Sequence, residues 1–187
     1  MSRLSDDRLI ELYSGTLRLV AERGYDRLTM DQIAEATKSS KATLYRQWGS
    51  KSALVVEAIK CVDDHVQEPP DTGTLRGDLM AIIDRSEQQE KDSDLLVAIL
   101  HACRQDHELA EAVRTEILDP GRARIRAVID RAVVRGEVAA DWPALDFVDY
   151  IFIAPIVLHH LLEGTEASAD FLRRYFEGVL LPALGIH

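Results

Sequence analysis

The stretch that decides the fold is residues 29–51, TMDQIAEATKSSKATLYRQWGSK. Thr29 and Gln32 have the spacing of a capping box, in which each residue satisfies a free backbone N–H of the other. The segment predicts a short helix after Thr29, a break at 38–40 and a second helix over 41–48. Two short helices joined by a tight turn are the parts of a helix-turn-helix.

The second of these helices separates its residues into two faces. Leu44 and Trp48 are four positions apart and share one side, which suits packing against neighbouring helices. The other side and the turn before it carry small, polar and cationic residues, namely Ser40, Lys41, Ala42, Thr43, Arg46 and Gln47. A pair of ordinary core helices leaves this outward set unexplained, whereas a helix that enters the major groove of DNA requires it.

Three more side chains fit contacts to DNA. Tyr45 offers a hydroxyl to a phosphate or an aromatic edge to a thymine methyl. Thr29 stands at a helix N-terminus, where free N–H groups and the helix dipole attract a phosphate. Lys51 repeats that arrangement at the start of the next helix.

The charge distribution supports this interpretation despite a net charge of −10. Residues 1–60 hold 10 Lys and Arg against 8 Asp and Glu, whereas residues 61–187 hold 12 against 24. Because salt screens charges beyond about 8 Å, a phosphate backbone responds to the local patch and not to the total. We expect a DNA-binding head and an acidic body.

Composition predicts a folded, soluble, cytoplasmic protein. Of 187 residues, 47% are apolar and 29% are charged, which is enough for a core and argues against disorder. No apolar run of about 18 residues suggests a membrane span, and the N-terminus lacks the pattern of a signal peptide. Cys61 and Cys103 lack metal or redox spacing and are predicted to be buried free thiols.

Nearly the whole chain is predicted to be helical, because apolar residues recur at three- and four-residue steps and no stretch alternates with period two. Outside the motif the expected helices are 5–23, 51–66, 75–90, 94–104, 106–118, 120–135, 143–163 and 168–182, with a loop at 68–74. Pro120 is placed in the first turn of its helix. Pro155, inside an apolar helix, is expected to kink it or to free one carbonyl.

The predicted fold class is all-α. We expect a three-helix head with a helix-turn-helix over residues 1–50, followed by a larger helical body over 51–187, with about nine or ten helices in total. The head is assigned to DNA binding, and the body to effector binding and dimerisation.

The motif resembles the signature of the TetR family of transcriptional regulators. The resemblance covers residues 10–54, and its T-L-Y-R-x-W-x-S-K core at 43–51 is specific. The rest of the chain matches only in length, helicity and order. The resemblance implies a sequence-specific DNA-binding regulator, a repressor that a small-molecule effector releases from a palindromic operator.

The resemblance also implies residue roles. Positions that usually grip phosphates correspond to Thr29, Tyr45 and Lys51. Positions that can touch bases correspond to Lys41, Ala42, Thr43 and Gln47, with Ser40 beside them, and Arg46 could do either.

The turn departs from the family pattern. A usual Ala-Gly-Val-Ser is replaced by Thr37-Lys38-Ser39-Ser40, so that Lys38 stands where glycine accepts positive φ and Ser39 where an apolar residue plugs the turn. A lysine at positive φ costs about 1 kcal/mol relative to glycine. We expect the turn to persist with slight strain, or to widen.

The resemblance further implies a homodimer through helices 143–163 and 168–182, and an unidentified small-molecule effector bound in the body. The first of these helices is apolar nearly all round, which fits either burial against a partner or a central helix of a monomer. Polar or aromatic side chains that could line an effector site are His101, Arg104, Phe152 and His159. The acidic body favours a neutral or cationic effector. Each of these residues also has an ordinary structural explanation, such as an ion pair between Arg104 and Asp106.

Two other classes of function were weighed. A metal-dependent enzyme would use His101, Cys103, His107, His159 and His160, but their spacing does not suit ligands on one helix face, and no catalytic motif occurs. A helical protein-interaction scaffold would make the basic head incidental. We therefore predict no enzymatic activity, no catalytic residue, no bound metal and no cofactor.

Overall fold

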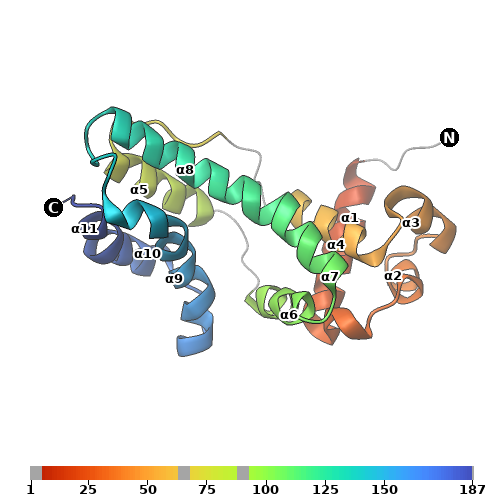
Figure 1. Ribbon diagram of the computed structural model, residues 1–187. Coiled ribbons are helices and arrows are strands. Elements are labelled where there is room, and N and C mark those ends of the chain that lie inside the picture. The colour runs from red at the N-terminus through yellow and green to blue at the C-terminus, as the bar shows by residue number, and fades with distance from the viewer. Residues whose placement is uncertain (1–5, 63–67, 88–92, 187) are drawn as a thin grey trace. The chain divides into compact units, whose positions relative to one another are not determined.

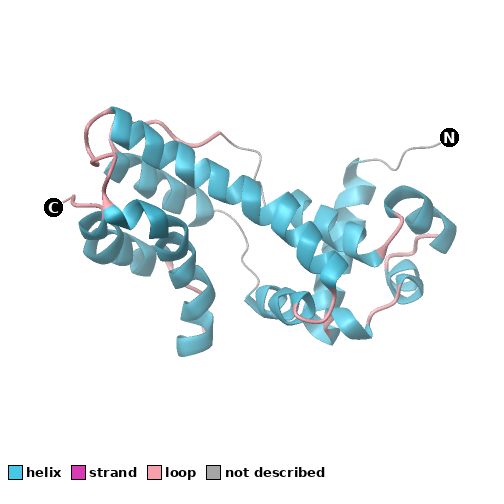
Figure 2. Cartoon of the chain, in the orientation of Figure 1, coloured by secondary structure: helices cyan, strands magenta, loops and turns pink. Residues whose placement is uncertain are grey.

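The computed structural model describes residues 6–62, 68–87 and 93–186. In these ranges every regular element is a helix and no strand occurs, so the all-α prediction is confirmed (Figure 2). The chain divides into two compact units, residues 1–66 with 94–120 and residues 67–93 with 121–187.

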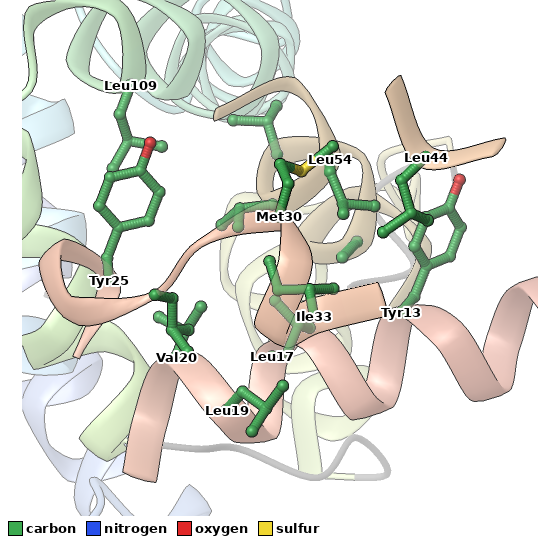
Figure 3. Close-up of a cluster of buried hydrophobic side chains, with 14 of the residues drawn as sticks. Tyr13, Leu17, Leu19, Val20, Tyr25, Met30, Ile33, Leu44, Leu54 and Leu109 are labelled. Atoms are coloured by element: carbon green, nitrogen blue, oxygen red, sulfur yellow. The ribbon is translucent and has the colours of Figure 1, made fainter. Parts of the chain in front are cut away.

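The first unit contains the helix-turn-helix. Its elements are α1 (Asp6–Arg23), η1 (Tyr25–Arg27), α2 (Met30–Ala36), α3 (Lys41–Trp48), α4 (Lys51–Val62), α6 (Ser93–Cys103), α7 (His107–Val113) and η2 (Arg114–Leu118) (Figure 1). Apolar side chains from α1, α2, α3, α4 and α7 converge on one core (Figure 3). Leu12, Ile33, Leu44, Leu54 and Leu109 have no exposed surface.

This packing unit is larger than a three-helix head. Helix α4 packs along α1 and against α7, and Leu54 and Val55 of α4 are fully buried there. The expected continuation of α4 to residue 66 lies outside the described residues beyond Val62. The packing of the helices does not test where the DNA-binding domain ends. The boundary between residues 50 and 51 therefore stays a prediction.

The second unit contains α5 (Leu75–Glu87), most of α8 (Asp119–Val134), η3 (Pro143–Phe147), α9 (Val148–Glu163), α10 (Ala169–Tyr175), η4 (Phe176–Leu180) and α11 (Leu181–Ala183). Its core is built around Leu79, Ile83, Ile129, Phe176 and Leu180, each at most 1% exposed. The predicted end of α5 near residue 90 lies outside the described residues.

Pro120 does not begin a new helix, so that boundary was wrong. Helical residues follow one another without a break from His107 to Val134, and the segment before the proline, η2, is a π-turn. There the N–H of Asp119 donates to the carbonyl of Arg114, five residues back. A π-turn is one of the ways in which a helix accommodates a local disturbance of its hydrogen-bond ladder, here next to a residue without an N–H. A second π-turn, η4, stands in the same relation to Pro182.

Pro155 frees a carbonyl, as predicted. It lies inside α9, and the carbonyl four residues earlier belongs to Ile151. The hydroxyl of Tyr175 donates to that carbonyl at 3.2 Å. Burial raises the pKa of Tyr175, which keeps the donor protonated. The helix thus tolerates its proline because α10 supplies the missing donor.

The helical stretch at residues 143–163 contradicts the expectation that no part of the chain suggests a membrane span by length and composition. This helical stretch is long and apolar enough to cross a membrane by length and composition, and 22% of the relevant window is buried. A single such helix is weak evidence for a membrane span. Its Asp149 is buried and paired with Arg122 and Arg126 at 3.1 and 3.5 Å.

The loop before α5 is fixed by a buried carboxylate. Asp78 is fully buried, and it accepts from the backbone N–H of Thr72 at 2.6 Å, from its hydroxyl at 2.8 Å and from Arg135 at 3.2 Å. Glu137 accepts from the N–H of Leu75 at 2.7 Å. Burial alone would raise the pKa of Asp78, but the hydrogen bonds from Thr72 and Arg135 outweigh it, so the pKa lies below its usual value.

Asp78→Ala is expected to lower the free energy of unfolding by about 3 kcal/mol, because it leaves buried donors and Arg135 without their acceptor. The contribution of Asp78 to stability is present at neutral pH and is lost as the pH falls below about 4, since its folded pKa is lowered. Urea unfolding measures both effects. Asp84→Ala removes an exposed partner of Arg173 and should change stability by less than about 0.5 kcal/mol. Equal losses for the two variants would contradict this account.

Candidate DNA-binding site

Helix α2 begins with the predicted capping box. The side chain of Thr29 accepts from the backbone N–H of Gln32 at 3.3 Å, and the side chain of Gln32 accepts from the backbone N–H of Thr29 at 3.0 Å. Thr29 is exposed, so this helix N-terminus stays accessible to a phosphate.

The turn between α2 and α3 keeps its tight form. Lys38 has φ 51°, the only positive φ of a non-glycine residue among those described. Its N–H donates to the carbonyl of Glu35 at 3.2 Å, and that of Ser39 donates to Ala34 at 2.8 Å. These two bonds form a Schellman motif, in which the left-handed position usually belongs to glycine. The expected strain at Lys38 is therefore present, and the turn does not widen.

A polar contact stands where the family has an apolar plug. Arg8 of α1 donates to the carbonyl of Thr37 and, at 3.3 Å, to the hydroxyl of Ser39. Sequence reasoning missed Arg8, because it lies 29 positions before Thr37. The signal that could have suggested such a partner is the serine itself, which needs a hydrogen bond when it is partly buried.

Helix α3 presents the two faces predicted from sequence. Ser40 caps the helix by accepting from the backbone N–H of Thr43 at 3.0 Å, and its hydroxyl lies 2.7 Å from the Thr43 hydroxyl. Leu44 is fully buried, and the ring of Trp48 meets Tyr13 edge to face at 5.9 Å. On the other side the exposed residues are Lys41, Ala42, Tyr45, Arg46 and Gln47, while Thr43 is half-buried.

The ammonium of Lys51 is already bound inside the protein and is not a free cation at the surface of the motif. Its ammonium donates to the carbonyls of Tyr25 and Leu28, both at 2.9 Å, and lies 3.8 Å from the centroid of the Tyr25 ring. Burial lowers the pKa of Lys51. The lysine therefore fixes the chain that leads directly into Thr29, and one of its three N–H groups remains for another acceptor.

The start of α7 supplies two carboxylates that sequence reasoning did not select. Asp106 caps α7 by accepting from Leu109 at 3.0 Å and also accepts from the hydroxyl of Tyr25 at 2.9 Å. Glu108 accepts from the hydroxyls of Ser50 at 2.8 Å and Ser52 at 2.5 Å. The bond from the N–H of Leu109 lowers the pKa of Asp106, and burial together with Asp106 raises that of Tyr25. These carboxylates join α7 to both ends of the helix-turn-helix.

The four side chains considered for an effector site are divided between the two units, two in each. In the first unit, His101 and Arg104 are exposed, and His101 lies 2.8 Å from Gln105. In the second unit, Phe152 packs in the core at 5.1 Å from Phe176. His159 is bonded to the carbonyl of Thr165 at 2.9 Å.

The other chemistry-bearing residues can also be placed. Within the described ranges, no group of three or more His, Cys, Asp or Glu side chains could hold a metal ion. Cys103 is half-buried but Cys61 is exposed, so the prediction of two buried thiols was wrong for Cys61. The partners of Asp106 are Tyr25 and Leu109, in place of the ion pair with Arg104 that was considered.

Two short helices joined by a tight turn, the second with one buried face and one exposed polar face, are the arrangement of the helix-turn-helix class of DNA-binding proteins. Residues 12–58 match the family model for bacterial regulatory proteins of the tetR family, and residues 69–179 match the tetracyclin repressor-like C-terminal domain. The chain belongs to the TetR family and is a DNA-binding transcriptional regulator.

Similar proteins include other transcriptional regulators. A DNA-binding transcriptional repressor TetR of Mycobacteroides abscessus is 32% identical over 183 residues, covering 94% of this chain and 93% of the relative. An uncharacterized HTH-type transcriptional regulator of Mycobacterium tuberculosis is 30% identical over 178 residues, covering 95% and 88%. The crystal structure of a TetR family transcription regulator, SCO0332, is similar with a TM-score of 0.64 and 27% identity, covering 94% of this chain and 97% of that one.

Lys38→Gly is expected to raise the free energy of unfolding by about 1 kcal/mol, because glycine adopts the left-handed conformation without strain from a Cβ atom. Urea unfolding of the purified protein measures the gain. Lys38→Ala removes the same charge and keeps the Cβ, so it should show no comparable gain. If both variants gain equally, the effect comes from charge and the strain assignment is wrong.

Proposed function

We propose that this regulator is a repressor that binds a palindromic operator as a homodimer and leaves it when a small-molecule effector binds. The observation that carries the proposal is the outward face of α3, which is exposed, cationic and free of large aliphatic side chains, opposite a fully buried Leu44. Two such faces on a two-fold dimer read two half-sites of a palindrome.

Within this proposal the side chains predicted to bind DNA have separate roles. Thr29, Tyr45 and Lys51 bind phosphates. Lys41, Ala42, Thr43 and Gln47 meet base edges beside Ser40, and Arg46 serves either purpose. Residues 1–50 form the DNA-binding domain, and residues 51–187 form the domain that dimerises and binds the effector.

The apolar surface of α9 supports a dimer through this helix and the segment from α10 to α11. Leu161 and Leu162 at the end of α9 are 76% and 75% exposed. Further exposed apolar residues on the same elements or beside them are Phe147, Tyr150, Ile156, Leu158 and Val179. So much apolar surface is uncommon on a monomer and is what a partner helix pair would bury. The same burial explains why this helix is apolar enough to resemble a membrane span.

Leu161→Glu is expected to raise the dimer dissociation constant by about 30-fold or more, because a carboxylate would be buried without a partner. Light scattering after gel filtration should then give the monomer mass at micromolar concentration. Val134→Glu is the matched control, since Val134 is 87% exposed at the end of α8, away from α9 to α11 in sequence. A dimer that persists in Leu161→Glu would exclude this part of α9 as the interface.

The effector is proposed to be a small neutral or cationic molecule bound in the acidic body. A protein with this fold, from Saccharomonospora viridis, has been crystallised in complex with choline. Its structure is similar to that of this chain, with a TM-score of 0.65 and 18% sequence identity. Of the proposed side chains, His101 and Arg104 lie in the first unit and Phe152 and His159 lie in the second, so each pair is a separate candidate for contact with the effector. The bound effector would weaken the binding of DNA, and DNA would equally weaken the binding of the effector. This coupling would make the effector an inducer.

We further propose that the protein acts in the cytoplasm, where its DNA lies, and carries no enzymatic activity. Family members are transcription factors. The alternative function is that of a protein-interaction scaffold. A measurement of DNA binding distinguishes the two functions, because a scaffold would show no salt-sensitive binding to duplex DNA.

Arg46→Ala and Tyr45→Ala are each expected to weaken binding to an operator fragment by about tenfold at 100 mM salt. Arg46→Ala should also reduce the slope of log K against log salt by about 1, if Arg46 contacts a phosphate. Lys51→Ala should weaken binding and, in addition, lower the unfolding temperature, because it loses two carbonyl acceptors as well. Fluorescence anisotropy with a fragment selected from genomic DNA by the wild-type protein measures these effects.

Arg85→Ala is the matched control, since it removes an exposed cation from α5, outside the helix-turn-helix and the proposed interface, and should leave affinity unchanged. All variants should remain dimers. Wild-type protein that recovers no genomic fragment, or that binds one without dependence on salt, would overturn the proposed function.

A further inference from the structure

The first residue of the recognition helix is held by an acidic residue of α2. The ammonium of Lys41 lies 2.7 Å from one carboxylate oxygen of Asp31 and 2.8 Å from the other. Both side chains are 58% exposed, so the pair stands on the surface of the motif. The hydrogen bond with Asp31 raises the pKa of Lys41, which stays charged at neutral pH. The ammonium also lies 5.9 Å from the ring centroid of Tyr45.

This pair forces a choice when DNA binds. Lys41 has three N–H donors and Asp31 holds up to two of them, so a bidentate contact to a base edge needs a donor that Asp31 holds. An exposed ion pair contributes only about 0–1 kcal/mol. A well-placed lysine contact to the major-groove acceptors of guanine discriminates by about 1–3 kcal/mol. A correct base can therefore take Lys41 from Asp31, whereas an incorrect site leaves the pair closed.

At an incorrect site the closed pair has a second effect. Non-specific binding depends on the number of phosphates that cations neutralise. With Lys41 bound to Asp31, this part of the motif offers no net positive charge to the backbone. The pair thus weakens binding to incorrect DNA more than binding to the operator.

We propose that Asp31 is a specificity-determining residue, which competes with DNA for Lys41 and so lowers affinity for non-operator sequences. The inference rests on the proposed function, because it requires that Lys41 faces the base edges. It assigns to α2 a role in discrimination although Asp31 itself touches no base.

Asp31→Asn tests the inference on the full-length protein. The probes are the genomic fragment selected by the wild type and a scrambled duplex of equal length and composition, at several salt concentrations. We expect the variant to bind the scrambled duplex about 3- to 10-fold more tightly at 100 mM salt and the selected fragment less than about twofold more tightly. The ratio of the two affinities should therefore fall by about 1.5- to 10-fold.

Two controls separate competition from a general change of charge. Glu35→Gln removes an exposed carboxylate from the same helix and should shift both affinities alike, leaving their ratio unchanged. In a Lys41→Ala background, Asp31→Asn should also leave the ratio unchanged, because the contested donor is gone. Asp31→Ser, with an unfolding temperature measured for each variant, guards against an effect of Asn on the start of α2.

Three results would overturn the inference while leaving the proposed function intact. These are an unchanged ratio in Asp31→Asn, an equal fall in the Lys41→Ala background, and weaker binding of the selected fragment, which would mean that Asp31 orients Lys41 for its base. Absence of salt-sensitive DNA binding by the wild type would overturn both proposals together.

Discussion

Burial of Leu44 is the constraint on which the DNA-binding face depends. Helix α3 has eight residues, so fixing one side of it against the core fixes the direction of every other side chain. Leu44 is buried among residues of α1, α2 and α4, and Ser40 and Gly49 close the two ends of the helix. The exposure of Lys41, Ala42, Tyr45, Arg46 and Gln47 therefore follows from an apolar contact on the opposite side of the helix.

A layer of polar contacts surrounds that core and sets the ends of the helices. Lys51 binds the two carbonyls that precede Thr29, Arg8 binds the turn after α2, and Asp106 binds Tyr25. Each of these bonds satisfies a backbone or hydroxyl group that has no partner inside its own helix. The position of the exposed helix end at Thr29 thus depends on charges contributed by α4 and, through Tyr25, by α7.

The prolines show how far local rules carry. Pro155 frees a carbonyl in an otherwise regular helix, and that much follows from its missing N–H. That a tyrosine of α10 fills the vacancy follows only from packing in the second unit. Pro120 is a residue typical of the first turn of a helix, yet the helix continues through it, because the π-turn before it accommodates the missing N–H. The local sequence shows where a helix loses a backbone hydrogen bond. The tertiary structure decides whether another side chain replaces that bond or the backbone adjusts.

The sequence by itself determined the all-helical fold, the capping box at Thr29 and the two faces of α3. All of these arise between residues at most four or five positions apart, where spacing decides which groups can meet. Only the tertiary structure decided that Lys51 binds carbonyls 23 and 26 positions away, that Arg8 supports the turn, and that Asp106 reaches a tyrosine 81 positions distant. A long charged side chain has many possible partners along a chain, and folding brings one of them within hydrogen-bond distance.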